Sequence, residues 1–191
     1  MNISEMKNRL AEIIIERSFK YSKDEPFTLS SGKKSHFYFD CKPTTLDPEG
    51  MNLIGNLVFD LLKNSEVTAA GGLSLGADPI ANAVSLISFQ NGRPIKSFIV
   101  RKDSKEHGTR KKIEGNLRPG EILAVLDDVV TTGASTITAI EAVREAGFTI
   151  ERVIVLVDRE EGGTENIKKY VDRIDPILTR TQIMDIYQTR S

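Results

Sequence analysis

The sequence predicts an α/β fold in which a parallel sheet is flanked by helices. Between residues 48 and 171, apolar strand-like runs alternate with helix-like segments, as in chains built from βαβ units. The runs at 122–126 and 150–157 are continuously apolar, which is typical of strands covered on both faces. Apolar residues then recur at helical spacing between these two runs, at Ala139, Ile140, Val143 and Ala146.

The N-terminal residues, up to about 45, predict a small hood over this sheet. Residues 3–17 have an amphipathic helical pattern. Two short strand-like pieces, at 27–30 and 36–40, flank a turn at 31–34. At 191 residues the chain has the length of one domain with a buried core. We therefore expect residues 1–191 to form one domain, with its core at about 46–172 followed by a C-terminal tail.

The core segments alternate between helices and strands, as expected for a parallel α/β sheet. Asp47 and Pro48 are a favourable helix start. After this helix, which extends to residue 62, we expect a strand at 67–72, a glycine-bearing loop at 73–76 and a helix at 79–89. A strand at 95–100 and a polar loop at 102–116 follow, before the two strands and the helix described above. The chain then continues with a helix at 166–171 and a tail at 176–187 of strand plus irregular chain. Parallel strands end at one edge, so the loops after residues 72, 100, 126 and 157 should converge on one site.

The loop after residue 126 combines a phosphate-binding turn with two acids. Asp127 and Asp128 end the apolar run, and a small, hydroxyl-bearing turn at 131–135 precedes the helix. Backbone N–H groups at a helix N-terminus suit a phosphate, and Gly133 lets the backbone approach it closely. The acids would repel that phosphate, so they must serve another part of the ligand.

Carboxylates accept hydrogen bonds from vicinal hydroxyls, and their negative field stabilises positive charge on a ribose whose C1 becomes electron-deficient. An isolated acid pair at a strand end more often caps a helix or binds a metal. The flanking strand, turn and helix instead favour a ribose 5-phosphate. The segment VLDDVVTTGAS resembles the binding motif for 5-phospho-α-D-ribosyl 1-diphosphate (PRPP) of the type I phosphoribosyltransferases. The resemblance implies that PRPP is held by Asp127, Asp128, Val129, Val130, Thr131, Thr132, Gly133, Ala134 and Ser135, with the two acids catalytic.

A second signal is the basic segment RKDSKEHG at 101–108. As a bare pattern it is a solvated charge run. In a phosphoribosyltransferase, however, cations would stabilise the leaving diphosphate, and a closing loop would exclude water. The pattern RKxxKxHG resembles the catalytic loop of orotate phosphoribosyltransferases. It implies that Arg101, Lys102, Lys105 and His107 bind the diphosphate, that Lys105 and His107 are catalytic, and that the loop is shared between the subunits of a homodimer.

The base is suggested by two further segments. FTLSSGKKSHFYFD at 27–40 resembles the N-terminal motif of the same family, which implies that Tyr38 and Phe39 line the orotate pocket beside Thr131. Arg159 follows the strand at 150–157, and a guanidinium pairs well with the carboxylate that orotate carries. Taken alone, these residues would be an aromatic hairpin and a surface arginine.

The segment GGLSLGADPIA at 71–81 resembles the family's loop for the diphosphate end. Two residues depart from the family pattern, because many orotate enzymes carry lysine where this chain has Ser30 and Gly76. Lys33 and Lys34 are candidates for the missing charge, or are simply solvated.

Composition limits the partners. With 26 basic and 27 acidic residues the net charge is -1, which gives no argument for nucleic-acid or membrane binding. Cys41 is the lone cysteine, so an internal disulfide is excluded. The N-terminus lacks the plan of a signal peptide, and we expect a cytoplasmic protein. Mg²⁺ is expected to arrive with PRPP, without direct protein ligands.

The expected reaction is orotate plus PRPP giving orotidine 5′-phosphate and pyrophosphate, a step of pyrimidine (UMP) biosynthesis. One rival is a phosphoribosyltransferase for a purine base or uracil. The other is a regulator that kept the fold to sense PRPP and bind nucleic acid.

Overall fold

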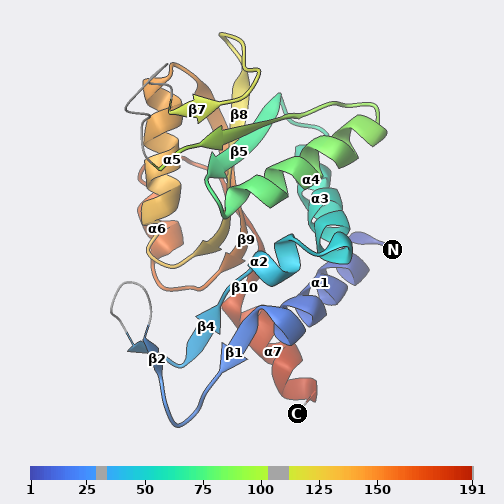
Figure 1. Cartoon of the computed structure of the whole chain (residues 1–191), viewed down its shortest axis with the longest axis vertical. Helices are drawn as coiled ribbons and strands as arrows, with labels where there is room; N and C mark the ends of the chain where they lie inside the picture. The colour runs from blue at the N-terminus through green and yellow to red at the C-terminus, as the bar shows by residue number, and fades with distance from the viewer. Residues whose placement is uncertain (29–33, 103–111, 191) are drawn as a thin grey trace.

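A mostly parallel sheet forms the centre of the computed structural model, which describes residues 1–28, 34–102 and 112–190 (Figure 1). Within these residues the strand order is β10-β9-β8-β5-β6-β7, and every neighbouring pair is parallel except β6 with β7. The predicted α/β sheet is therefore confirmed. The strands are β5 (Ala69–Leu73), β6 (Lys96–Val100), β7 (Ile113–Glu114), β8 (Ile122–Val130), β9 (Thr149–Asp158) and β10 (Ile174–Thr179).

Helices cover both faces of this sheet, and the alternation of side chains along β8 shows how. Leu123 and Val125 pack into one apolar cluster with helix α5 (Ala134–Glu145), while Ala124 and Leu126 pack into the other. That second cluster contains α1 (Ile3–Arg17), α3 (Pro48–Leu62) and α4 (Ala77–Gln90). Figure 1 shows α5 on one side of the sheet and α3 with α4 on the other. Continuous apolar runs were required because both faces are buried.

The helix starts follow their local sequence signals. The Asp47 carboxylate accepts hydrogen bonds from the N–H groups of Glu49 and Gly50, and Pro48 occupies the first turn of α3. This arrangement confirms the predicted start. At α1, Asn2 and Glu5 form a reciprocal capping box.

The hood differs in pairing from the expected hairpin. Strand β2 (Phe27–Thr28) pairs with β3 (Lys34–Ser35), but β4 (Phe37–Phe39) pairs with β1 (Phe19–Tyr21), which the sequence pattern did not reveal. The Phe19 and Phe39 rings lie 4.9 Å apart between their centroids, so aromatic packing holds this pair. A three-residue strand is too short to produce a periodic signal. A short helix, α2 (Lys42–Thr45), then leads into α3.

The C-terminal segment was predicted as strand plus irregular chain, and this was wrong beyond residue 179. Helix α7 (Arg180–Arg190) follows β10 directly. Its Ile183 is fully buried in the cluster with α1, and Arg190 forms ion pairs with Glu12 and Glu16 of that helix. The tertiary contact with α1, rather than an amphipathic pattern, stabilises α7. The last core helix, α6 (Gly163–Ile167), also begins earlier than predicted.

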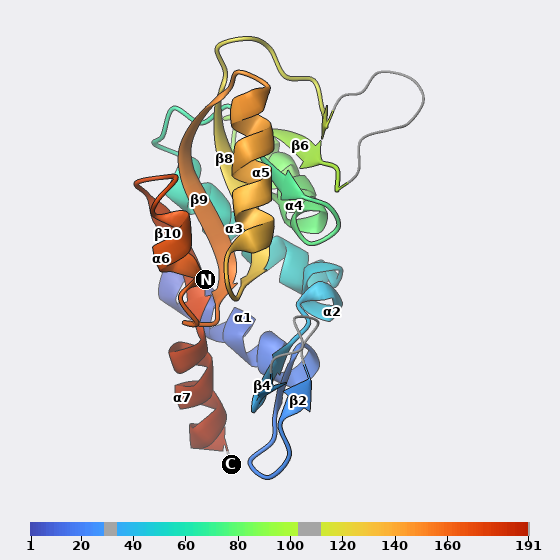
Figure 2. The same ribbon diagram turned by 90° about the vertical axis from the view of Figure 1, so that its left-hand side faces the viewer.

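The hood and α2 lie at the end of the sheet where β8 and β9 finish (Figure 2). The loops that follow these strands therefore face the hood, which agrees with the prediction that the loops after the parallel strands meet at one site. Across the described ranges, no helix combines the length and apolar character needed to cross a membrane.

Candidate active site

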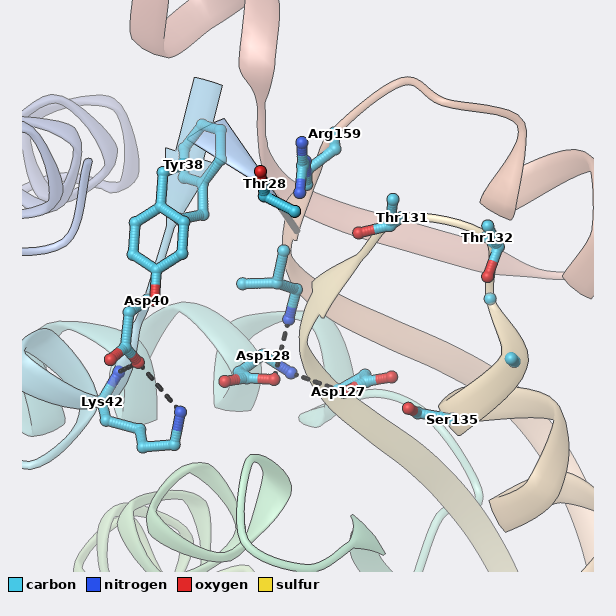
Figure 3. A pocket seen from close by; sticks show the side chains of 14 residues that line it. Thr28, Tyr38, Asp40, Lys42, Asp127, Asp128, Thr131, Thr132, Ser135 and Arg159 are labelled. Carbon is cyan, nitrogen blue, oxygen red and sulfur yellow. Dashed lines mark hydrogen bonds and ion pairs between the residues drawn. The ribbon is translucent and has the colours of Figure 1, made fainter. Parts of the chain in front are cut away.

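A cavity of about 580 Å³ lies between the hood and the loop that joins β8 to α5 (Figure 3). The hood and α2 supply one wall, the β8–α5 loop supplies the opposite wall, and Arg159 comes from the end of β9. The lining residues are Thr28, Tyr38, Phe39, Asp40, Lys42, Asp127, Asp128, Val129, Thr131, Thr132, Gly133, Ala134, Ser135 and Arg159. Segments far apart in the sequence thus form one site.

A smaller cavity of about 200 Å³ adjoins it on the far side of the two acids. It shares Lys42, Asp127, Asp128 and Ser135 with the larger cavity. Its other residues come from the loop between β5 and α4 and from Lys102 at the end of β6. Two of the predicted loops, those after residues 72 and 100, therefore meet the acids here.

Asp127 is a buried acid at the centre of the site, only 7% exposed. Its Oδ2 accepts a hydrogen bond of 2.5 Å from Thr136 Oγ1, and its Oδ1 accepts one of 3.0 Å from the Asp128 N–H. Burial raises the pKa of Asp127 to about 7, against the lowering effect of the Thr136 hydrogen bond and with a further rise from the charge of Asp128. Thr136, which sequence reasoning missed, thus positions this carboxylate.

The phosphate-binding turn has the backbone that the sequence indicated. Gly133 is the N-cap residue of α5 and has φ 82°, and a Cβ at this position would lie 2.9 Å from the Gly163 carbonyl oxygen. Every member of the predicted PRPP motif lines the larger cavity except Val130, whose side chain is buried in the cluster with α5. The open N-terminus of α5 therefore borders the cavity.

Arg159 lines the same cavity close to the turn at 131–135 (Figure 3), because its backbone N–H donates to the Val130 carbonyl at 3.0 Å, and it is 4% exposed. Its Nη2 forms an ion pair of 2.7 Å with Glu161 and donates to Ser35 Oγ at 3.1 Å and to the Phe37 carbonyl at 3.3 Å. Its Nε is buried without a hydrogen-bond partner. The protein therefore anchors Arg159 but does not satisfy all of its donors. Sequence reasoning did not identify Glu161 as the anchor.

The aromatic wall comes from β4. Tyr38 and Phe39 both line the cavity, as predicted, and Arg159 lies over the Phe39 ring at 5.9 Å from its centroid. Asp40 follows them in the sequence, and its Oδ1 forms an ion pair of 2.9 Å with Lys42 Nζ. Lys42 was not among the predicted site residues.

The basic segment is described only in part. Lys102 lines the smaller cavity, and Arg101 is half-buried with an ion pair of 3.4 Å to Glu114. Lys105 and His107 lie outside the described residues, as do Ser30 and Lys33. Lys34 is exposed in β3 and is not among the residues that line either cavity.

Among the described residues, no cluster of three or more His, Cys, Asp or Glu side chains could hold a metal ion. The larger cavity is lined by the carboxylates of Asp127 and Asp128, which are hard oxygen ligands, and by that of Asp40, which is paired with Lys42. Mg²⁺ commonly binds through one or two carboxylates together with substrate phosphates and water. The site is therefore compatible with Mg²⁺ bound mainly through a diphosphate ligand.

Comparison with known proteins agrees with this geometry. No protein-family model matches the chain. An orotate phosphoribosyltransferase of Aquifex aeolicus (strain VF5) is 51% identical over 163 residues, covering 85% of this chain and 89% of that protein. The crystal structure of Mycobacterium tuberculosis H37Rv orotate phosphoribosyltransferase in complex with Fe(III) dicitrate has a TM-score of 0.80 and 35% identity, covering 93% of this chain and 98% of that chain.

A second structure of the M. tuberculosis protein, in complex with PRPP, has a TM-score of 0.74 and 30% identity over 94% of this chain and 92% of that chain. These similarities cover most of the chain rather than one motif. The chain belongs to the orotate phosphoribosyltransferase family.

Proposed function

We propose that this protein transfers the ribose 5-phosphate of PRPP to orotate, giving orotidine 5′-phosphate and pyrophosphate. One observation carries the proposal. A single cavity is lined by a phosphate-binding turn, by two acids and by a buried, incompletely satisfied arginine. This charge pattern matches a ribose phosphate joined to a planar base that bears a carboxylate.

The 5-phosphate of PRPP binds at residues 131–135, where the N–H groups of α5 are open to the cavity. Asp127 and Asp128 accept hydrogen bonds from the ribose hydroxyls. The diphosphate then extends into the smaller cavity, beside Lys102 and the β5–α4 loop. This orientation places C1 of the ribose next to the two carboxylates.

In the reaction, the bond between C1 and the diphosphate oxygen breaks, and its electron pair leaves with the diphosphate. Positive charge develops on the ribose ring, and the carboxylates stabilise it. Orotate attacks C1 through its ring nitrogen as an anion, so no strong protein base is needed. Arg101, Lys102, Lys105 and His107 stabilise the leaving diphosphate, and His107 can donate a proton to it.

Arg159 selects the base. Its guanidinium has donors beyond those that Glu161, Ser35 and Phe37 use, and it can pair with the orotate carboxylate. Tyr38 and Phe39 border the flat ring of the base, and Thr131 lies beside it. A phosphoribosyltransferase for an uncharged base would leave this buried charge without a ligand partner, which disfavours that rival.

Mg²⁺ is the metal that this site suits best. It would bind through the diphosphate and the ribose hydroxyls near Asp127 and Asp128, and it would neutralise part of the charge of the leaving diphosphate. The regulatory rival is disfavoured by a net charge of -1, which provides no general attraction for nucleic acid. The same composition favours a cytoplasmic protein made of one domain.

We also infer a homodimer in which the basic loop completes the partner's site. Large apolar side chains are exposed on α4 and the loop before it, with Phe89 70%, Leu75 71% and Leu86 59% exposed. Leu86 and Phe89 line one groove beside β6, and Leu75 lies on the loop that borders the smaller cavity. Exposed apolar side chains that gather on a surface often form an interface between subunits.

The Arg159→Ala variant should raise the KM for orotate by roughly ten-fold to a hundred-fold, because a charge-assisted pair with the carboxylate is lost. The KM for PRPP should change by less than about two-fold. Arg173→Ala is a matched control, since Arg173 lies just before β10 and is the exposed ion-pair partner of Asp175. Steady-state kinetics checks both values, and equal effects on the two substrates would refute the assignment.

Asp127 should make activity and stability respond oppositely to pH. The Asp127 carboxyl has a pKa of about 7 in the folded protein, against an ordinary value of 3.8. It therefore keeps its proton up to a higher pH in the folded state than in the unfolded state. The free energy of unfolding should therefore fall as pH rises from about 4 to 7, by up to roughly 4 kcal/mol. Turnover should rise over the upper part of this range, because only the ionised acid stabilises the cationic ribose.

Urea unfolding at several pH values measures this contribution against Asp127→Asn. The variant should lack the pH-dependent loss and be more stable than the parent protein above pH 7, yet nearly inactive. A variant whose stability follows the same pH curve as the parent would show that Asp127 does not titrate there.

Subunit mixing tests the shared loop. Lys105→Ala and Asp128→Ala should each be nearly inactive, because they remove a loop cation and a ribose-facing acid. When the two variants exchange subunits, mixed dimers regain one intact site, and activity should recover to roughly a quarter of the parent level. If the activity of the mixture never exceeds the summed activities of the two separate variants, or if the protein has the mass of a monomer in solution, the shared site is refuted.

A further inference from the structure

At the proposed diphosphate end of the site, the loop between β5 and α4 provides no positively charged side chain. This loop lines the smaller cavity with Leu73, Ser74, Leu75 and Gly76, none of which is basic. Gly76 lines the smaller cavity, and a Cβ at this position would lie 2.5 Å from Asp128 Oδ1. A longer side chain therefore could not be added without moving that carboxylate. A cation for this part of the site must come from another element.

Lys42 comes from the hood side of the site and lines both cavities. In the described part of the chain, Lys42 and Lys102 are the basic residues that line the smaller cavity. Two carboxylates, Asp127 and Asp128, line it as well. A diphosphate entering this space would meet strong repulsion unless both cations faced it.

Asp40 fixes the position of Lys42. One oxygen of Asp40 accepts a hydrogen bond of 3.2 Å from the Lys42 backbone N–H and another of 2.9 Å from its Nζ (Figure 3). The hydrogen bond with Asp40, assisted by the charge of Asp128, raises the pKa of Lys42, so the ammonium is protonated at neutral pH. The side chain is 53% exposed, which leaves its other two N–H donors free for a ligand.

We propose that Lys42 binds the diphosphate of PRPP at the junction of the two cavities and supplies the charge that Gly76 cannot carry. The inference rests on the proposed binding of PRPP, whose C1 lies beside Asp128. As the bond between C1 and oxygen breaks, the electron pair moves onto the diphosphate oxygen. The Lys42 ammonium donates hydrogen bonds to the diphosphate and keeps its proton. Asp40 is a positioning residue, because it acts only through Lys42.

The reverse reaction tests this role, because pyrophosphate is then a free substrate. In Lys42→Met, which keeps the length but removes the charge, the KM for pyrophosphate should rise by about ten-fold or more. The KM for orotidine 5′-phosphate should stay within about two-fold of the parent value. Lys42→Arg should retain most of the affinity for pyrophosphate. Lys63→Met is a matched control, since Lys63 forms a similar exposed pair with Asp60 away from both cavities.

Direct titration of pyrophosphate into each variant, together with its melting temperature, separates binding from folding. An unchanged KM and affinity for pyrophosphate in Lys42→Met would overturn the inference. Equal losses for pyrophosphate and orotidine 5′-phosphate, also seen in Lys42→Arg, would reduce Lys42 to a structural partner of Asp40. If the parent protein neither binds nor uses pyrophosphate, the proposed function itself fails, so the two failures are distinguishable.

Discussion

The site depends on a carboxylate that the fold holds out of water. Asp127 lies within β8, a strand whose two faces are both buried, and Thr136 in the first turn of α5 donates a hydrogen bond to it. Keeping a charge there is unfavourable, and the raised pKa of Asp127 reflects that cost. The same burial strengthens its electrostatic effect on a ribose that gains positive charge. The position is thus poor for stability and suited to catalysis.

The cations of the site are arranged by a related principle. Arg159 and Lys42 each form an ion pair with a protein carboxylate, Glu161 and Asp40 respectively. These acids hold the basic groups in place while no substrate is bound, so the side chains need less ordering when an anionic ligand arrives. Each basic group retains donors for that ligand. Arg159 and Lys42 lie on different sides of Asp128 (Figure 3), which fits the proposal that one binds the base and the other the diphosphate.

Local patterns predicted the fold and most of the cavity wall. Strands β8 and β9 and the turn at 131–135 lie in short segments whose composition is typical of their structure, whereas Arg159 was identified from its place after β9 and from the family resemblance. The β1–β4 pairing, helix α7 and the roles of Glu161 and Lys42 depend on contacts between distant segments or on groups that resemble ordinary surface charges. Lys42 comes near Asp127 only after the hood folds over the sheet. The side chains of Lys105 and His107 lie outside the described residues, so their roles rest on the sequence resemblance.

The most direct measurement is the initial rate of the purified protein with PRPP, Mg²⁺ and either orotate, uracil or hypoxanthine. If a buried arginine and a cation-stabilising acid pair together define the site, orotate is consumed with equimolar release of pyrophosphate. Uracil and hypoxanthine, which lack the carboxylate, should react far more slowly. Rapid turnover of either uncharged base with inert orotate would contradict the account.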